Sequence, residues 1–279
     1  IFGAFSRLEE LKVKYPDLEV LLAMPAIQTD KRRAIISRLE AIKVAVRTVP
    51  SFRDLISDQK KMADIQDLSL DDLLPRGRFV KDTLKLMSDK RIFISGAGGS
   101  IGSEITRQLL DSNPKSIILF DISEYNLFQL ERECLAQKAS ANLSTKIIPI
   151  LGDIKDSKNL SFVFKKYQVD DVFHAAAYKH VPLVEDVNNI IKASENNVLG
   201  TLNLANISIE QKVKSFVMIS TDKAVRPSNI MGASKRMSEM IIQSLNKQQS
   251  CTQFSMVRFG NVINSSGSVI PTFLDQISN

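Results

Sequence analysis

Four polar residues near one another in the sequence could carry acid–base chemistry. Thr221, Asp222 and Lys223 directly follow an apolar run at 214–220, and Lys235 comes soon after them. A carboxyl group beside an amine can give and take protons when their pKa values move toward neutrality. A structural interpretation is also available, because Ser, Thr and Asp favour helix caps and a lysine beside them is commonly solvated. The elements that position these side chains decide between the two interpretations.

A glycine-rich segment earlier in the chain predicts a phosphate-binding loop. The apolar run at 91–95 leads into Gly96, Gly99 and Gly102, and a helical pattern follows. Strand, glycine loop and helix in this order place backbone N–H groups and a helix N-terminus around a pyrophosphate. Asp121 ends the next apolar run, where a carboxylate accepts hydrogen bonds from an adenosine ribose and repels a 2′-phosphate. Together these features predict a bound dinucleotide, with NAD favoured over NADP.

From Arg91 onward, apolar runs alternate with amphipathic stretches, which is typical of a parallel sheet covered by helices. The expected strands are 91–95, 116–121, 145–151, 171–176, 214–220 and 253–258, and the expected helices are 100–112, 124–138, 157–167, 186–209 and 230–246. This order predicts the doubly wound (Rossmann) α/β fold with right-handed crossovers. Ligands of that fold bind at the carboxyl ends of the strands, where Thr221, Asp222 and Lys223 would lie.

The first 60 residues are expected to form a fragment of an N-terminal α/β domain. A helix would precede a βαβ unit with a strand at 18–24, a helix at 31–42 and a strand at 44–49. This unit is too small to be stable alone and has no glycine-rich loop. Residues 61–89 are expected to be a helical linker, and 90–279 the NAD-binding catalytic domain with a truncated C-terminal substrate lobe. The chain is therefore interpreted as a piece of a longer protein.

Composition excludes several classes of protein. A hydrophobic fraction of 44% in 279 residues supports a sizeable core. The net charge of +6 is spread without a basic block, which argues against nucleic-acid binding. Cys134 and Cys251 lack metal-type spacing and are expected to be buried and reduced. The only histidines are His174 and His180, so no histidine-rich metal site is expected. No apolar run reaches the roughly 18 residues that a membrane span needs.

The segment Met231–Lys235 resembles the active-site helix of short-chain dehydrogenases/reductases, which carries Tyr-x-x-x-Lys. In that motif the lysine binds the nicotinamide ribose and lowers the pKa of the tyrosine base. Methionine stands in place of the tyrosine here. Four segments closely resemble the bacterial UDP-N-acetylglucosamine 4,6-dehydratases of the extended group of that family: 174–182, 196–201, 221–235 and 257–262. The large, membrane-anchored members of this group also carry methionine at this position.

The resemblance implies a redox-neutral dehydration of a UDP-sugar. NAD takes hydride from carbon 4, water is eliminated across carbons 5 and 6, and hydride returns to carbon 6. Lys223 would be the base at carbon 5, which requires a depressed pKa, and Asp222 the acid toward the carbon 6 hydroxyl, which requires a raised pKa. Thr221 would hydrogen-bond the carbon 4 oxygen, and Lys235 would hold the cofactor ribose. Water and Asp222 are both open as the base at carbon 4.

Further residues complete the expected site. Lys179 and Asn261 would contact the substrate near its diphosphate, as the resemblance implies. Asp153 would either bind adenine or cap the next segment, and Asn197 is expected to tie backbone together rather than contact substrate. The expected cofactor residues are Gly96, Gly99, Ser100, Ile101, Gly102, Asp121, Ser123, Asp153, Ile154, Ala175, Ala176, Ala177 and Lys235, and the expected substrate residues are Lys179, Met231, Arg258, Asn261 and Val262.

Two other functions stay open. One is a nucleotide-sugar epimerase or reductase of the same family, against which Met231 counts because most epimerases need the tyrosine. The other is an NAD-sensing homologue without catalysis, which would have no use for an acid–base pair. A homo-oligomer is expected because the helical patterns at 186–209 and 230–246 leave apolar positions exposed: Leu202, Met237, Met240 and Ile241. The expected location is cytoplasmic, at the inner face of the membrane if the full-length protein is anchored.

Overall fold

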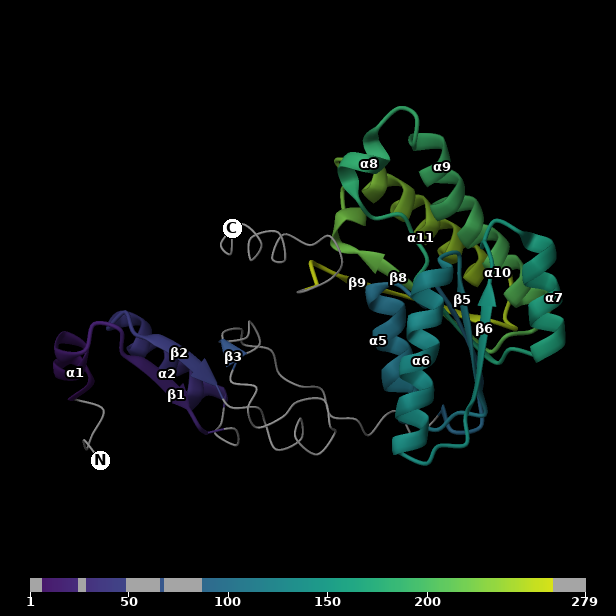
Figure 1. Ribbon diagram of the computed structural model, residues 1–279. Coiled ribbons are helices and arrows are strands. Elements are labelled where there is room, and N and C mark those ends of the chain that lie inside the picture. The colour runs from purple at the N-terminus through teal and green to yellow at the C-terminus, as the bar shows by residue number, and fades with distance from the viewer. Residues whose placement is uncertain (1–6, 25–28, 49–65, 68–86, 263–279) are drawn as a thin grey trace. The chain divides into compact units, whose positions relative to one another are not determined.

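A computed structural model of the chain describes residues 7–24, 29–48, 66–67 and 87–262 (Figure 1). The chain divides into two units, Ile1–Val80 and Lys81–Asn279. The larger unit is built on a parallel sheet whose strands lie in the order β6-β5-β4-β7-β8-β9. The strands are β4 (Arg91–Ser95), β5 (Ser116–Asp121), β6 (Lys146–Leu151), β7 (Asp171–His174), β8 (Ser215–Thr221) and β9 (Gln253–Phe259). This order confirms the predicted doubly wound fold, with the switch point between β4 and β7.

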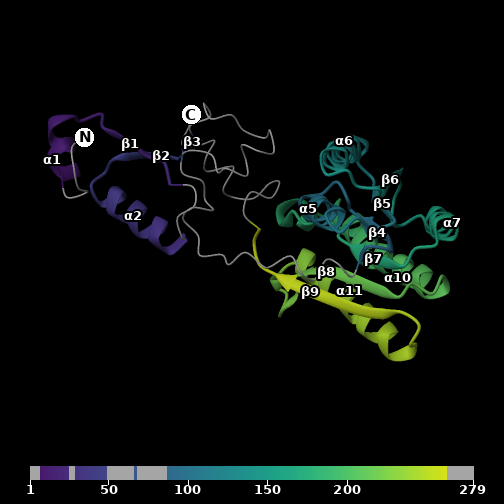
Figure 2. The same ribbon diagram turned by 90° about the horizontal axis from the view of Figure 1, so that it is seen from below.

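Helices cover both faces of this sheet because alternate residues of each strand point to opposite sides. Ile92 and Ile94 of β4 pack in one core with α5 (Ser100–Leu110) and α6 (Glu124–Ser140), which lie side by side in Figures 1 and 2. Phe93, between them, packs in a second core with α7 (Ser157–Tyr167), α10 (Gly200–Glu210) and α11 (Ile230–Gln248). The central strands are therefore apolar on both sides, as the continuous apolar runs predict.

The helix predicted at 186–209 is present, but it begins later than expected, at Ile190, and it is not a regular α-helix throughout. A short helix, α8 (Val181–Glu185), ends at Asp186, whose carboxylate accepts hydrogen bonds from the backbone N–H (2.9 Å) and the side-chain amide (3.0 Å) of Asn188. Such a local turn competes with helix formation. The helix resumes as α9 (Ile190–Ser194), widens into one π-helical stretch, η3 (Glu195–Leu199), and continues as α10. π-helical turns are frequent at functional sites.

The smaller unit contains α1 (Leu8–Lys14), β1 (Glu19–Leu22), α2 (Thr29–Ala41), β2 (Ala45–Thr48) and β3 (Gln66–Asp67). Strands β1 and β2 are parallel, as the βαβ prediction requires, and Leu22, Ile36 and Leu39 are its buried core. Strand β3 pairs antiparallel with β2, so two residues of the expected helical linker form a strand. Residues 61–65 and 68–86 of that linker lie outside the described residues. The expected domain boundaries stay a prediction.

Cys134 is buried, as expected, whereas Cys251 is exposed. None of the helices among the described residues is long and apolar enough to cross a membrane. Among the same residues, no group of His, Cys, Asp and Glu could hold a metal ion. Met237 and Met240 are exposed on α11, whereas Leu202 and Ile241 are half-buried. The expected homo-oligomer therefore stays a prediction.

Candidate active site

The glycine loop between β4 and α5 is glycine-rich because neighbouring backbone comes too close for side chains. Gly96 has φ +65°, and a Cβ there would lie 2.6 Å from the Cα of Ala176. A Cβ at Gly102 would lie 2.1 Å from the carbonyl oxygen of Gly96, so the first turn of α5 rests directly on the loop. The loop thus brings a helix N-terminus to the carboxyl end of β4, which is the arrangement that binds phosphate.

Two adjoining cavities open beside this loop. The first, of 590 Å³, lies between the α5 N-terminus and α8–α9 and is lined by Gly99, Ile101, Lys179 and Lys192 among others. The second, of 250 Å³, is bounded by Asp121 and Asp153. The N-cap of α5, Gly99, has no side chain that could cap the helix. An anion in the first cavity would therefore meet the positive end of the α5 dipole.

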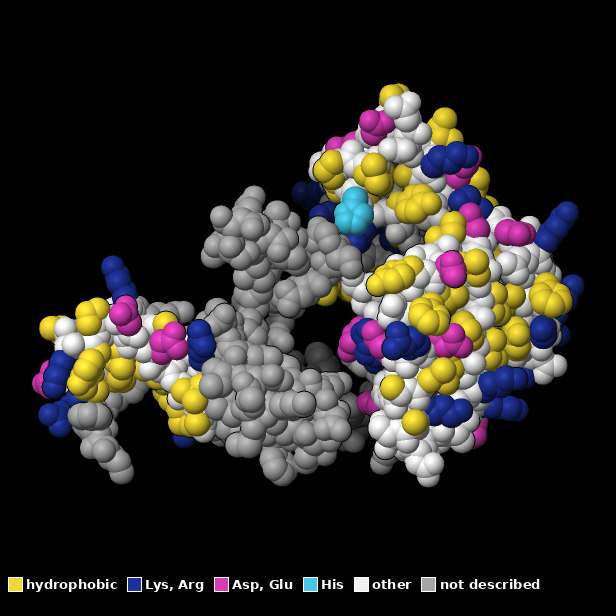
Figure 3. Space-filling model, viewed as in Figure 1, with side chains coloured by type: hydrophobic (Ala, Val, Ile, Leu, Met, Phe, Trp, Pro, Cys, Tyr) yellow, Lys and Arg dark blue, Asp and Glu magenta, His cyan; other side chains and the backbone are white. Residues whose placement is uncertain are grey.

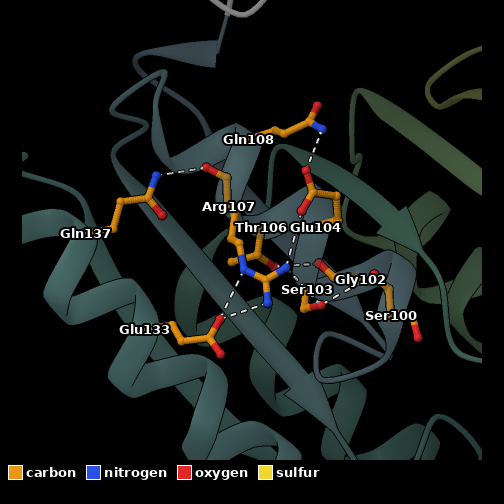
Figure 4. Close-up of polar contacts among 9 residues, drawn as sticks. All are labelled: Ser100, Gly102, Ser103, Glu104, Thr106, Arg107, Gln108, Glu133 and Gln137. Atoms are coloured by element: carbon orange, nitrogen blue, oxygen red, sulfur yellow. Dashed lines mark hydrogen bonds and ion pairs between the residues drawn. The ribbon is translucent and has the colours of Figure 1, made fainter. Parts of the chain in front are cut away.

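The position of α5 is fixed by polar contacts with α6, shown in Figure 4. The guanidinium of Arg107 donates to the Glu133 carboxylate through Nε (3.0 Å) and Nη2 (2.8 Å). The side-chain amide of Gln137 donates to the Arg107 carbonyl (3.1 Å). Within α5, the Thr106 hydroxyl donates to the Gly102 carbonyl (2.8 Å). These contacts hold the helix whose N-terminus faces the first cavity.

Asp121 is a buried carboxylate held by backbone donors. It is 8% exposed, and its two oxygens accept hydrogen bonds from the backbone N–H groups of Gly98 and Ser123, each at 2.8 Å. Ser123 in turn caps α6 by accepting from the Asn126 N–H. Both Asp121 and Ser123 line the second cavity, at the end of β5 where a ribose would lie.

Asp153 forms a local turn and also lines the second cavity. Its carboxylate accepts from the backbone N–H of Lys155 (2.8 Å) and pairs with the Lys155 ammonium (2.7 Å). Burial raises the pKa of this carboxyl, but the Lys155 contacts outweigh burial and the pKa is lowered. Ile154 lines the same cavity and packs on Gly200, where a Cβ would lie 2.5 Å from its Cδ1. Asp153 therefore caps the segment that follows it, as one of the two expectations had it. A role of Asp153 toward adenine stays a prediction.

Asn197 ties the wall of the cavities to α11, as expected. Ala175, Ala177 and Tyr178 line both cavities, and Ala176 lines the second. The Asn197 amide accepts from the Tyr178 N–H (2.8 Å) and donates to the Tyr178 carbonyl (3.1 Å) and the Ser234 hydroxyl (3.0 Å). The π-helical η3 therefore places one side chain between the strand end and the helix of Lys235.

His174 is the last residue of β7 and is a buried structural residue. The Thr201 hydroxyl donates to the Asn197 carbonyl (2.6 Å), so His174 Nε2 must donate to that hydroxyl (2.9 Å). Its Nδ1 then accepts from the Ser95 hydroxyl (2.7 Å). Complete burial, with the nearby Lys235 charge, lowers the His174 pKa to about 3. The imidazole is therefore neutral and moves no proton near neutral pH.

The acid–base segment lies at the carboxyl end of β8. Thr221 ends the strand, and Asp222–Ala224 form a 3-10 turn, η4. The Thr221 hydroxyl donates to Asp222 Oδ1 (3.0 Å), and the Lys223 ammonium donates to the same oxygen (3.2 Å) and to Asn261 Oδ1 (3.1 Å). The contacts with Thr221 and Lys223 lower the pKa of Asp222. An acid at carbon 6 needs a raised pKa, so the lowered pKa of Asp222 is opposite to that requirement.

The helix α11 packs closely on this segment. A Cβ at Gly232 would lie 2.3 Å from the Lys223 carbonyl oxygen, so any side chain here would push the helix and this segment apart. Lys235 is 5% exposed, and burial lowers its pKa to about 8. Met231 is also 5% exposed and packs in an apolar cluster with Val184 and Ala193. Met231 thus fills a core, and its expected substrate contact stays a prediction.

The remaining expected substrate residues are distributed over different parts of the candidate site. Lys179 lines the first cavity, where partial burial lowers its pKa. Asn261 contacts Lys223, and Val262, half-buried, ends the described part of this region. Arg258 instead donates to the buried Glu239 through Nε (2.7 Å) and Nη2 (2.6 Å), while its own side chain is exposed. The sequence analysis missed Glu239, although its place one helical turn after Lys235 was a usable signal.

The candidate site residues lie within the part of the chain that is similar to known proteins. A family model described as "Polysaccharide biosynthesis protein" matches residues 92–279. The capsular polysaccharide biosynthesis protein CapD of Staphylococcus aureus is 39% identical over 99% of this chain and 46% of its own length. A UDP-glucose 4-epimerase of Rickettsia akari is 37% identical over 68% of this chain and 54% of its own length. A UDP-N-acetylglucosamine 4,6-dehydratase (inverting) of Campylobacter jejuni is 35% identical over 67% of this chain and 54% of its own length.

A solved structure agrees with the fold. The X-ray structure of Pen from Bacillus thuringiensis is 38% identical, with a TM-score of 0.63, over 69% of this chain and 58% of that chain. This chain spans about half the length of the curated relatives that it matches.

On the face drawn in Figure 3, basic and acidic side chains of the described residues are interspersed. That face carries no extended basic patch of the kind that binds nucleic acid.

Proposed function

The chain belongs to the polysaccharide biosynthesis protein family, and on that premise we propose that it is an NAD-dependent 4,6-dehydratase of UDP-N-acetylglucosamine. Its product would be a UDP-4-keto-6-deoxy-N-acetylhexosamine. The observation that carries the proposal is the pair Asp222–Lys223 at the carboxyl end of β8, joined by a hydrogen bond of 3.2 Å. Removal of a proton at carbon 5 and protonation of a hydroxyl at carbon 6 need one base and one acid side by side.

The residues around the glycine loop fit NAD. Asp121, fixed by Gly98 and Ser123, suits two ribose hydroxyls and disfavours a 2′-phosphate. The uncapped N-terminus of α5 suits the pyrophosphate, and Lys235 would hold the nicotinamide ribose. NAD, when bound, supplies the capacity to accept a hydride from carbon 4 and to return it to carbon 6. The expected cofactor residues of the loop and of 175–177 are accordingly proposed as its contacts.

The contact between Asp222 and Lys223 also supplies a route to the required protonation states. As an ion pair, the amine cannot act as a base and the carboxylate cannot act as an acid. Transfer of one proton along the hydrogen bond from Lys223 to Asp222 gives a neutral amine and a carboxylic acid. A bound sugar that excludes water would favour this neutral pair, because desolvation disfavours both charges. Lys223 then takes the carbon 5 proton, Asp222 protonates the carbon 6 hydroxyl, and water leaves. The Lys223 ammonium returns a proton to carbon 5 when hydride is delivered to carbon 6.

Met231 has no group that exchanges protons, so the proton of the carbon 4 hydroxyl must go elsewhere. Thr221 would hydrogen-bond the carbon 4 oxygen, and its own hydroxyl contacts Asp222 at 3.0 Å. A water molecule would receive the proton when Asp222 already holds the one from Lys223. If Asp222 receives it instead, Lys223 must lose its proton to solvent.

A second candidate function is 4-epimerisation of a UDP-sugar, favoured by the Rickettsia relative named a UDP-glucose 4-epimerase. An epimerase returns hydride to carbon 4 and leaves the carbon 6 hydroxyl in place. The Asp222–Lys223 pair then has no proton to move at carbon 5 or carbon 6, which is why dehydration is the leading proposal.

The test uses the whole protein with UDP-N-acetylglucosamine. Formation of a 4-keto-6-deoxy sugar is followed by its absorbance in alkali and by NMR. Lys223→Met and Asp222→Asn should each lower turnover roughly 10²–10⁴-fold while NAD binding stays unchanged. Lys247→Met, an exposed lysine of α11, is the control and should have wild-type turnover. Conversion to the 4-epimer without a keto sugar would establish the epimerase instead.

A further inference from the structure

Glu239 is a fully buried carboxylate that joins three segments of the chain. Its exposed fraction is 0%. One oxygen, Oε1, accepts hydrogen bonds from the Ser220 hydroxyl (2.6 Å) and from Arg258 Nε (2.7 Å). The other, Oε2, accepts from Arg258 Nη2 (2.6 Å) and Arg236 Nη1 (2.9 Å). Strands β8 and β9 and the helix α11 therefore meet at one side chain.

Each of these segments carries a residue of the candidate site. Ser220 directly precedes Thr221 at the end of β8. Arg258 lies near the end of β9, and the chain then reaches Asn261, which accepts from Lys223. Lys235 lies one helical turn before Glu239, so the two share a face of α11. A shift of Glu239 would therefore move the acid–base segment relative to Lys235.

Stability alone is a poor reason to bury this charge. A buried ion pair often stabilises a protein no more than packed apolar side chains of similar volume would. Burial raises the pKa of Glu239, but hydrogen bonds from Arg258, Ser220 and Arg236 outweigh it and lower the pKa to about 2. The carboxylate is thus ionised at every working pH, with a geometry fixed by four short hydrogen bonds.

We propose that Glu239 is a positioning residue, which holds Thr221–Lys223 and Asn261 in register with Lys235 without contacting substrate. The proposal rests on the function proposed above. It also changes the role of Arg258, which would act through Glu239 and not through direct contact with the sugar nucleotide.

Glu239 has a second effect, on the charge of Lys235. Lys235 interacts electrostatically with Glu239 on α11 and with His174 on β7, which is neutral. The Glu239 carboxylate in turn pairs with Arg236 of α11 and Arg258 of β9. Burial lowers the Lys235 pKa, and Glu239 raises it. Loss of the Glu239 charge should therefore make Lys235 lose its proton at lower pH.

The main variant is Glu239→Gln, whose amide would turn N–H groups toward the N–H donors of the arginines. We expect kcat to fall about 10- to 100-fold, because a misplacement on the order of 1 Å has this effect, while KM changes less than about threefold. Glu210→Gln is the matched control, since it removes an exposed carboxylate at the end of α10. It should leave kcat and KM unchanged.

Calorimetry of NAD binding against pH gives a readout that does not depend on the sugar reaction. Wild-type affinity should decline above a pH of about 8, as Lys235 loses its proton. In Glu239→Gln the decline should begin at lower pH. Should the whole protein show this shift but no dehydratase activity, the proposed function fails and the role of Glu239 stands.

Folding is checked by circular dichroism, and Ser220→Ala covers the case in which Glu239→Gln does not fold. Glu239 Oε1 keeps Arg258 in this variant, so the fold should survive while the tether to β8 is lost. Its kcat should fall several-fold, about three- to tenfold, at unchanged KM. The proposal is overturned if Ser220→Ala or a folded Glu239→Gln keeps wild-type kcat. It is overturned equally if Glu239→Gln loses stability and activity together with no change in the pH dependence.

Discussion

Gly232→Ala should impair catalysis far more than folding. Gly232 lies in the first turn of α11, one residue after Met231 and shortly before Lys235. A Cβ at this position would lie 2.3 Å from the Lys223 carbonyl oxygen and 3.2 Å from Asn229 Oδ1, which caps the helix. A single added methyl group therefore acts on the interface between the helix and the acid–base segment.

The size of the effect follows from this contact. To move from 2.3 Å to an ordinary contact of at least 3.4 Å, the helix and the Lys223 carbonyl must separate by about 1.1 Å. Overpacking of this kind costs about 1–3 kcal/mol, while replacing glycine by alanine in a helix stabilises by about 1 kcal/mol. The free energy of unfolding should therefore fall by about 0–2 kcal/mol. Turnover should fall about 10²-fold, because Lys223 moves relative to Lys235.

Urea denaturation gives the free energy of unfolding, and formation of the 4-keto-6-deoxy sugar gives kcat. Ser244→Ala, on the exposed part of the same helix, is the control, and it should change neither quantity appreciably. A Gly232→Ala protein that is about 1 kcal/mol more stable and has wild-type kcat would refute the reasoning. It would mean that α11 and η4 do not approach as closely as the structure has them.

Three further outcomes are expected. Asp121→Ala should narrow the preference for NAD over NADP, measured as two dissociation constants by calorimetry; a wild-type protein that binds NADP as tightly would contradict the role of this carboxylate. Met231→Tyr should raise activity by less than about tenfold, because the Met231 side chain fills an apolar cluster with Val184 and Ala193. An inactive wild-type protein together with a strongly active variant would contradict the enzyme proposal. The free energy of unfolding should decrease as the pH falls from about 6.5 toward about 3, because the unfolded state binds a proton at His174 that the folded state does not. Replacing His174 by Gln should reduce the slope of the free energy of unfolding against pH by roughly 1.4 kcal/mol per pH unit between about pH 4 and pH 6. An unchanged slope would argue against a neutral, buried His174.

Local patterns were sufficient for the order of elements in the larger unit. Each strand of the sheet is a short apolar run bounded by polar or glycine residues, and such runs are readable without knowledge of their partners. The run 116–121 predicted β5 with its actual bounds, and with it the position of Asp121. The helix expected at 186–209 begins only at Ile190, because Asp186 forms a turn with Asn188. Helical periodicity continues across such a turn, so it gives no signal of where the helix begins.

The sequence by itself determined the fold class, the glycine loop and the proximity of Thr221, Asp222 and Lys223, because each depends on residues that are neighbours along the chain. Only the tertiary structure decided which distant groups meet. Arg258 carries a charge that suits a diphosphate, but the fold pairs it with Glu239 at 2.6 Å. Lys235 is an ordinary helix lysine in the sequence, and burial at 5% exposure lowers its pKa to about 8. Burial and long-range pairing set the energies of charged groups, and neither is encoded in local spacing.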